Sequence, residues 1–261
     1  MGISGNKEES DRENRINERI CKDSKIVKID KDLIQVLKSI CKIIIQNGDK
    51  YTIGTGFLIK LFKKNILFYY LMTNEHIITE EMVESKEEIE IYYDYENKKN
   101  LITLNKEERE INQYKNNDLD ITIVQILEKD DINEFYFLLP NLDYKNLKDK
   151  KIYIPQFPEG NDLSYSKGEI IKVKKYELFH NASTKEGSSG SPIFLKNTTK
   201  VIGIHKQGNK YKEENYGNFI FPIIYMLNEK NIYFDDQYEG ELLMINLKEK
   251  ENMFMMMENI I

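Results

Sequence analysis

The chain has 261 residues, of which 31% are charged, and its 38 basic and 44 acidic residues give a formal net charge of −6. This length suits one large all-β domain or two small ones, and the acidic balance argues against a nucleic-acid or anionic-membrane surface. The two cysteines, Cys21 and Cys41, suggest neither a disulfide framework nor a metal site, and no apolar run reaches transmembrane length.

Residues 1–30 are polar and charged and are expected to form a flexible N-terminal arm. They lack the apolar core of a signal peptide, so the sequence predicts an intracellular, cytoplasmic protein. Asp32 is placed to cap a short helix with Leu33, Val36 and Leu37 on one face.

Short runs of β-branched and aromatic residues then recur, separated by clusters of Asn, Asp, Gly and Lys. Many short strands at this spacing predict a barrel or a sandwich, and six runs followed by six are compatible with two small barrels. The predicted strands are 40–46, 52–62, 66–73, 89–93, 101–104, 121–127, 135–139, 151–155, 169–174, 192–195, 201–205 and 219–222. Residues 224–231 could form a helix after the last strand, and the methionine-rich residues 253–257 are expected to pack on a surface rather than bind a cofactor.

A serine between glycines, followed by proline, stands out at residues 187–192 (Gly-Ser-Ser-Gly-Ser-Pro). The glycines allow a sharp turn, in which the amides of Gly187 and Ser189 can point at one spot beside the Ser189 hydroxyl. Hydrogen-bond donors at that spot would stabilise the oxyanion that develops when the hydroxyl attacks a carbonyl group. A plain turn between strands explains the same residues, and a hydroxyl is a poor nucleophile without a base.

Three histidines are candidates for that base: His76, His180 and His205. His76 follows the apolar run 66–73, where a strand is expected to end and a helical turn to begin. A surface histidine at a strand end is the alternative. His180 is interpreted as structural.

An acidic residue directly before a β-branched run, Asp120, can be buried at the start of a strand. A buried carboxylate must be hydrogen-bonded or paired. An imidazole N–H is a suitable partner, and this bond leaves the other ring nitrogen free as a base. Asp118 is the competing choice, and an Asx-turn is the structural alternative for both.

His76, Asp120 and Ser189 therefore occur in this order, and the sequence resembles chymotrypsin-fold (trypsin-like) serine peptidases over roughly residues 36–228. Its motifs are most similar to those of glutamyl endopeptidase-like and Deg-like domains. The matching segments are Gly-Thr-Gly-Phe-Leu at 54–58, Thr-Asn-Glu-His at 73–76, Asp-Ile-Thr-Ile-Val at 120–124, Gly-Ser-Ser-Gly-Ser-Pro at 187–192 and Val-Ile-Gly-Ile-His at 201–205.

This resemblance implies an all-β fold of two six-stranded antiparallel β-barrels, with the active site between them and a short C-terminal helix. The peptidase domain would span residues 31–230, with barrel one at about 36–130 and barrel two at about 148–227. Residues 231–261 would be a C-terminal extension.

The implied activity is that of a serine endopeptidase acting on protein or peptide substrates, with no cofactor and no metal. His76 would be the base, Asp120 would orient it, and the amides of Gly187 and Ser189 would form the oxyanion hole. Asn74 and Glu75, in place of small residues, and Ser191, in place of the more usual glycine, depart from many relatives. None of these changes removes a group that the mechanism needs.

Two other functions fit parts of the sequence. One is a catalytically silent peptidase-fold module that binds a protein partner. The other is an α/β-hydrolase esterase, although its order of serine, acid and histidine differs from the order here.

The residues expected to line the pocket for the side chain before the scissile bond are Thr184, His205 and Gly203. The position where trypsin-like enzymes with basic specificity carry a carboxylate is Ser183, which has no charge. Histidine and threonine here resemble glutamyl endopeptidases and picornaviral chymotrypsin-fold cysteine proteases. An imidazole N–H and a hydroxyl suit a carboxylate or amide oxygen, so we expect cleavage after Glu and then Gln. A histidine buried in a strand for packing alone is the alternative for His205.

Overall fold

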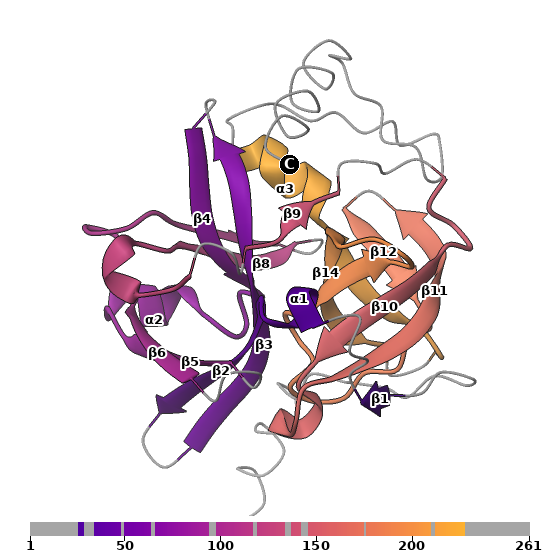
Figure 1. The fold of residues 1–261 in the computed structure, drawn as a ribbon, viewed down its shortest axis with the longest axis horizontal. Coiled ribbons are helices and arrows are strands. Elements are labelled where there is room, and N and C mark those ends of the chain that lie inside the picture. Colours follow the sequence, from indigo (N-terminus) through magenta and orange to yellow (C-terminus); the bar gives the residue numbers. More distant parts are fainter. Residues whose placement is uncertain are drawn as a thin grey trace, which may run out of the picture.

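The chain forms two antiparallel β-sheets that lie side by side, with few helices (Figure 1). A computed structural model describes residues 26–28, 34–47, 50–63, 66–93, 98–116, 119–133, 137–141, 146–174, 176–209 and 212–227. The predicted all-β class is confirmed.

The first sheet, barrel one, comes from the N-terminal half of the chain and has seven strands in the order β6-β5-β2-β3-β4-β8-β7. Alternating burial along β5 directs Ile89, Ile91 and Tyr93 inward, as expected for a sheet with one buried face. The strands are β2 (Ile40–Asn47), β3 (Lys50–Lys63), β4 (Ile66–Thr73), β5 (Glu88–Tyr93), β6 (Lys98–Thr103), β7 (Ile111–Lys115) and β8 (Asp120–Gln125).

The second sheet, barrel two, has the order β1-β11-β10-β13-β14-β15-β12, and pairing of β11 with β12 closes its last six strands into an antiparallel barrel. The short strand β9 joins β14 in parallel. The strands are β1 (Ile26–Lys28), β9 (Leu139–Pro140), β10 (Lys151–Gln156), β11 (Ser164–Lys174), β12 (Glu177–His180), β13 (Pro192–Leu195), β14 (Lys200–Gly208) and β15 (Asn215–Phe219).

The helices of the described residues are short. They are α1 (Ile34–Leu37), α2 (Glu80–Glu84), α3 (Ile220–Leu227) and the 3-10 turns η3 (Glu128–Asp130) and η5 (Pro158–Gly160). Thr79 caps α2 by accepting a hydrogen bond from the Met82 amide at 3.3 Å. Among the described residues, no helix is long and apolar enough to cross a membrane.

Three apolar clusters hold the fold together. One fills barrel one and another fills barrel two. The largest joins the two barrels: it combines Phe57 and Met72 of barrel one with Phe157 and Phe194 of barrel two, and with residues of α1 and α3. Burial of such side chains contributes about 1.5–3 kcal/mol each, so this cluster fixes how the two barrels face each other.

The segment predicted as a strand at 219–222 is mostly helical, and that prediction is wrong. Phe219 ends β15 and Ile220 begins α3, which therefore starts earlier than the predicted 224–231. Pro222 is tolerated because the first amides of a helix have no intrahelical partner. Residues 228–231 lie outside the described part of the chain.

Three strands of the barrels were missed because each is short and rich in polar residues: β7, β12 and all of β15 except Phe219. Strand β1, inside the predicted arm, was missed as well. Because β7 is present, barrel one has seven strands rather than six. A strand was also predicted at 135–139, but among the described residues of this range only Leu139 belongs to a strand. Within the predicted arm, Ile26–Lys28 pairs with β11; the rest of the arm, Asp118 and the tail 231–261 lie outside the described residues. The antiparallel sheets rule out the α/β-hydrolase alternative.

A buried ion pair in barrel one generates a test of the fold. Arg109 binds Asp130 through two contacts of 2.7 and 2.9 Å, and the two side chains are 1% and 3% exposed. Arg109→Met leaves the Asp130 carboxylate buried and unpaired, so we expect the free energy of unfolding to fall by about 3–5 kcal/mol. Chemical denaturation measures this change.

The matched control is Lys99→Met, which breaks an exposed ion pair with Glu90. Its expected effect is below about 1 kcal/mol. Equal losses for the two variants would contradict the structural role assigned to the buried pair.

Candidate active site

His76 is positioned by the buried end of β4. The last four residues of this strand are buried, and the chain then makes one helical turn in which the Asn74 carbonyl accepts hydrogen bonds from the amides of Ile77 and Ile78 at 3.2 Å each. The Asn74 side chain donates to the backbone carbonyl of Asp120 at 2.7 Å. Asn74 thus ties the histidine turn to β8.

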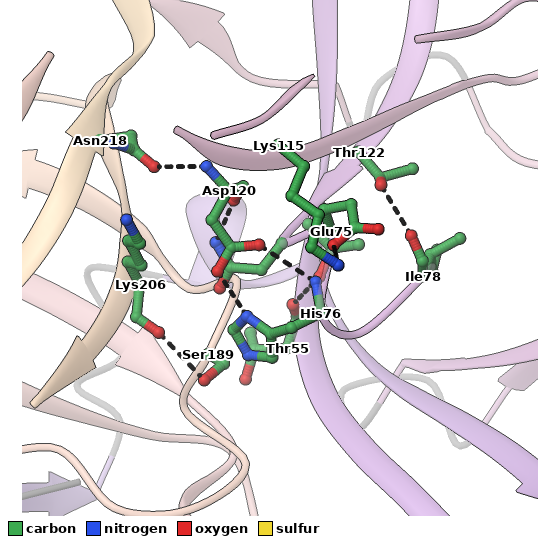
Figure 2. A network of polar contacts seen from close by, with 12 residues as sticks. Thr55, Glu75, His76, Ile78, Lys115, Asp120, Thr122, Ser189, Lys206 and Asn218 are labelled. Atoms are coloured by element: carbon green, nitrogen blue, oxygen red, sulfur yellow. Dashed lines mark hydrogen bonds and ion pairs between the residues drawn. The ribbon is translucent and has the colours of Figure 1, made fainter. Parts of the chain in front are cut away.

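Asp120 holds His76 by two hydrogen bonds. Its Oδ2 lies 2.5 Å from His76 Nδ1, and its Oδ1 accepts from the His76 backbone amide at 3.0 Å (Figure 2). The exposed fractions of the two side chains are 21% and 13%. Two contacts from one residue fix both the position and the orientation of the imidazole ring.

Burial alone would raise the pKa of Asp120, because a low-dielectric surrounding disfavours the charged form. The hydrogen bonds from the ring and the amide of His76 and the charge of nearby Lys206 outweigh this effect, so the pKa of Asp120 lies below its usual value. Its carboxylate is therefore charged at neutral pH.

A side chain of barrel two also reaches Asp120. The Asp120 backbone amide donates to Asn218 Oδ1 of β15 at 3.2 Å (Figure 2). The pair His76–Asp120 thus belongs to barrel one but is tied to barrel two.

The loop that carries Ser189 comes from barrel two and needs glycine at two places. Gly187 and Gly190 have φ values of +88° and +89°, which disfavour other residues. A Cβ atom at Gly190 would lie 2.0 Å from the Thr55 carbonyl oxygen. Thr55 in turn donates its backbone amide to the Ser189 carbonyl at 2.8 Å, so the loop is fitted directly against β3.

Ser189 lies beside the His76 ring, on the side that faces away from Asp120 (Figure 2). Its hydroxyl donates to the backbone carbonyl of Lys206 at 3.2 Å, and His76 Nε2 is buried without a hydrogen-bond partner among the described residues. The structure therefore places the three predicted residues in one site, with the bond between serine and histidine not yet made. Such bonds are often long or unformed before substrate binds.

The predicted pocket residues Thr184 and His205 are both fully buried. Strand β14 holds His205 next to the serine loop: its carbonyl accepts from the Gly190 amide at 3.0 Å, and its amide donates to the Ser191 carbonyl at 2.7 Å. Gly203 is different, because a Cβ atom there would lie 2.8 Å from the Leu178 side chain in the core of barrel two. The assignment of Gly203 to the pocket stays a prediction.

His180, interpreted from the sequence as structural, contacts the ring of His205. Its Nε2 is 3.3 Å from His205 Nδ1, and both rings are fully buried. Burial first, and the neighbouring His205 second, hold the pKa of His180 well below its usual value. Only a missed strand, β12, brings this histidine to its place, so sequence spacing gave no indication of the contact.

Sequence reasoning also missed Lys206, Asn218 and the role of Thr55. Asn218 and Thr55 act through contacts across the two barrels, and Lys206 acts through its backbone carbonyl on Ser189. No local pattern reveals these contacts. Among the described residues, no three His, Cys, Asp or Glu side chains gather as possible metal ligands.

Comparisons with known proteins agree with the observed fold. The model of the trypsin-like peptidase domain family matches residues 54–204. Among solved structures, a Glu endopeptidase in complex with MPD is similar with a TM-score of 0.59 and 17% identity, over 80% of this chain and 97% of that one.

A serine endoprotease from Yersinia pestis is similar with a TM-score of 0.55 and 13% identity, over 77% of this chain and 68% of that one. The HtrA-type protease AlgW gives a TM-score of 0.55 and 12% identity, over 76% and 62%. At these identities the likeness shows the fold. Comparison with curated protein sequences gives no match.

The buried His180 predicts how stability depends on pH. Its folded-state pKa is lowered, so below the unfolded-state value of about 6.5 the unfolded chain binds a proton that the folded chain does not. The wild-type protein should therefore lose up to about 1.4 kcal/mol per pH unit as the pH falls below 6.5, until the folded pKa is reached.

The variant His180→Gln lacks this titration, so its stability should fall less steeply over the same range. Urea denaturation at several pH values between about 5 and 8 measures both curves. Parallel curves for the two proteins would show that folding does not lower the pKa of His180.

Proposed function

Because this chain belongs to the trypsin-like peptidase domain family, we propose that it is a serine endopeptidase with His76, Asp120 and Ser189 as its catalytic triad. One observation carries the proposal. The 2.5 Å contact to Asp120 occupies His76 Nδ1, and His76 Nε2, in the site that holds Ser189, is buried and has no hydrogen-bond partner in the part of the chain that the structure describes. A ring nitrogen in that state is suited to accept a proton.

The proposed reaction begins when the Ser189 hydroxyl turns from the Lys206 carbonyl to His76. His76 Nε2 takes the proton as Ser189 Oγ attacks the peptide carbonyl carbon, and the new imidazolium is stabilised by the charged Asp120. The tetrahedral intermediate then collapses to an acyl-enzyme as His76 gives its proton to the leaving amine. Water, activated in the same way, releases the acid product.

The backbone amides of Gly187 and Ser189 are the proposed donors to the oxyanion. Donors already in place when charge develops lower the barrier without further reorganisation. The glycine conformation at position 187 supports this assignment, because it lets the chain turn so that amides two residues apart face one point.

We infer that the enzyme prefers Glu, and then Gln, before the scissile bond. The proposed pocket residues Thr184 and His205 are buried beside the serine loop, and each can donate a hydrogen bond to a carboxylate or amide oxygen. A neutral His180 that donates from Nε2 to His205 Nδ1 would keep a proton on His205 Nε2, which is the donor that such a substrate needs. The Glu endopeptidase among the similar structures supports this preference.

We also infer that the peptidase domain spans residues 31–230, with barrel one at about 36–130 and barrel two at about 148–227. The family match at residues 54–204 lies inside these bounds. A catalytically silent binding module, the runner-up from the sequence, is disfavoured by the geometry of His76 and Asp120.

One test of the proposed function concerns the nucleophile. Ser189→Ala removes one buried hydroxyl and opens no cavity of consequence, so the melting temperature should stay nearly unchanged while peptide hydrolysis falls by about 10⁴-fold or more. Turnover of a peptide library by purified wild-type and variant protein measures the loss. Ser85→Ala, which removes an exposed hydroxyl at the end of α2, is the control and should keep full activity.

Another test of the proposed function concerns specificity. Thr184→Val and His205→Ala each remove a proposed donor, so kcat/KM for cleavage after Glu should fall by about 10²-fold or more relative to other residues. Thr184→Ser keeps the hydroxyl and should keep the preference. A cleavage profile dominated by Arg, Lys or aromatic residues in the wild-type protein would refute the pocket assignment and leave the triad assignment intact.

A further inference from the structure

Both peptide groups that flank Gly187 are fixed by hydrogen bonds from other parts of the chain. On one side, the Glu186 carbonyl accepts from the Glu159 backbone amide at 2.5 Å. On the other side, the Gly187 carbonyl accepts from the Thr55 hydroxyl at 2.7 Å. The C=O and N–H of a trans peptide point in opposite directions, so the first bond directs the Gly187 N–H away from Glu159.

The turn η5 packs against Gly187 without space for a side chain. A Cβ atom at Gly187 would lie 2.5 Å from the Phe157 carbonyl oxygen and 3.0 Å from the Gly160 amide nitrogen. The backbone of the turn is thus in direct contact with the loop, and movement of the turn would move the peptide between Glu186 and Gly187.

The turn itself has an unusual conformation that is held from several sides. Glu159 and Gly160 both have positive φ values, 56° and 68°, and the first is costly for a residue with a side chain. The Gly160 carbonyl accepts from Lys42 Nζ of β2 at 2.8 Å, and Lys185 Nζ binds Glu159 Oε2 at 3.0 Å. These contacts keep the Glu159 amide aimed at the serine loop.

Thr55 of β3 connects the same parts from barrel one. Its hydroxyl accepts from the Phe157 amide at 3.2 Å while donating to Gly187. Its backbone amide donates to the Ser189 carbonyl at 2.8 Å, and its carbonyl accepts from the Thr73 hydroxyl at 2.8 Å. Thr55 is fully buried, and Figure 2 shows it in the same site as Ser189, which it contacts. One residue therefore links η5, the serine loop and the strand that ends before His76.

We propose that Thr55 and Glu159 are positioning residues that hold the Gly187 amide in the orientation of an oxyanion donor. Thr55 acts through its hydroxyl and Glu159 through its backbone amide. The inference rests on the proposed function, in which Ser189 is the nucleophile and Gly187 an oxyanion donor. It predicts that the donor is in place before substrate binds.

The test compares Thr55→Val, which keeps the shape and removes the hydroxyl, with Thr55→Ser, which keeps the hydroxyl. Loss of an oxyanion donor typically lowers kcat by about 10²-fold. We expect a fall of that size for Thr55→Val with KM changed less than about threefold, and Thr55→Ser within about fivefold of wild-type kcat. Thr198→Val, which removes a hydroxyl that donates to the Leu195 carbonyl in the turn before β14, is the matched control and should keep wild-type kcat.

Two further measurements separate positioning from a general structural defect. A peptide boronate, which forms a tetrahedral adduct with a serine nucleophile, should bind Thr55→Val more weakly in proportion to the loss of kcat/KM. The pH profile of kcat/KM should keep its wild-type shape, because the contact between His76 and Asp120 is untouched.

Replacing Glu159 by its α-hydroxy acid tests the turn even if Thr55→Val does not fold. The change removes only the backbone N–H and keeps the side chain, and we expect kcat to fall at least tenfold. Wild-type kcat in this variant, or in a folded Thr55→Val, overturns the proposal, as does a Thr55→Ser variant as impaired as Thr55→Val. If Ser189→Ala keeps wild-type turnover, the proposed function fails as well; if Ser189→Ala is inactive and Thr55→Val is active, only the positioning role fails.

Discussion

The carboxylate of Asp120 is the constraint on which the site depends. It is largely buried and charged, and a buried charge must be paired and hydrogen-bonded. His76 meets this need with both its ring and its backbone amide. The same two bonds that stabilise the carboxylate therefore set the position of His76, the proposed base. Asn74 and Asn218 hold Asp120 from either side through its backbone, so the orientation of the imidazole is determined by both barrels.

The site lies where two independently built barrels meet, and its geometry follows from how they pack. The apolar cluster between the barrels includes Phe57, which follows Thr55 in β3 by two residues, and Phe157, which precedes the turn η5. Packing of these side chains brings Thr55 within hydrogen-bond distance of the serine loop. Hydrophobic packing thus determines which polar contacts form between the barrels. These polar contacts alone would be too weak to hold the two barrels in a fixed relative position.

The sequence predicted the parts of this protein that depend on local chemistry. A histidine at a strand end, an aspartate before an apolar run and a serine between glycines each have a local signature, and the strands rich in β-branched residues were found. Polar strands such as β12 were not, so the contact of His180 with His205 could not be foreseen. Likewise, a threonine in a strand does not reveal that its hydroxyl reaches across to Gly187.

The central claim is that Ser189 is made nucleophilic by the His76–Asp120 pair, and covalent labelling tests it most directly. A fluorophosphonate reagent reacts with an activated serine, and mass spectrometry of the digested protein locates the adduct. The account predicts one adduct, on Ser189, that forms rapidly in the wild-type protein and hardly at all in a folded His76→Ala variant. An adduct on another residue, or labelling at the same rate without His76, would contradict it.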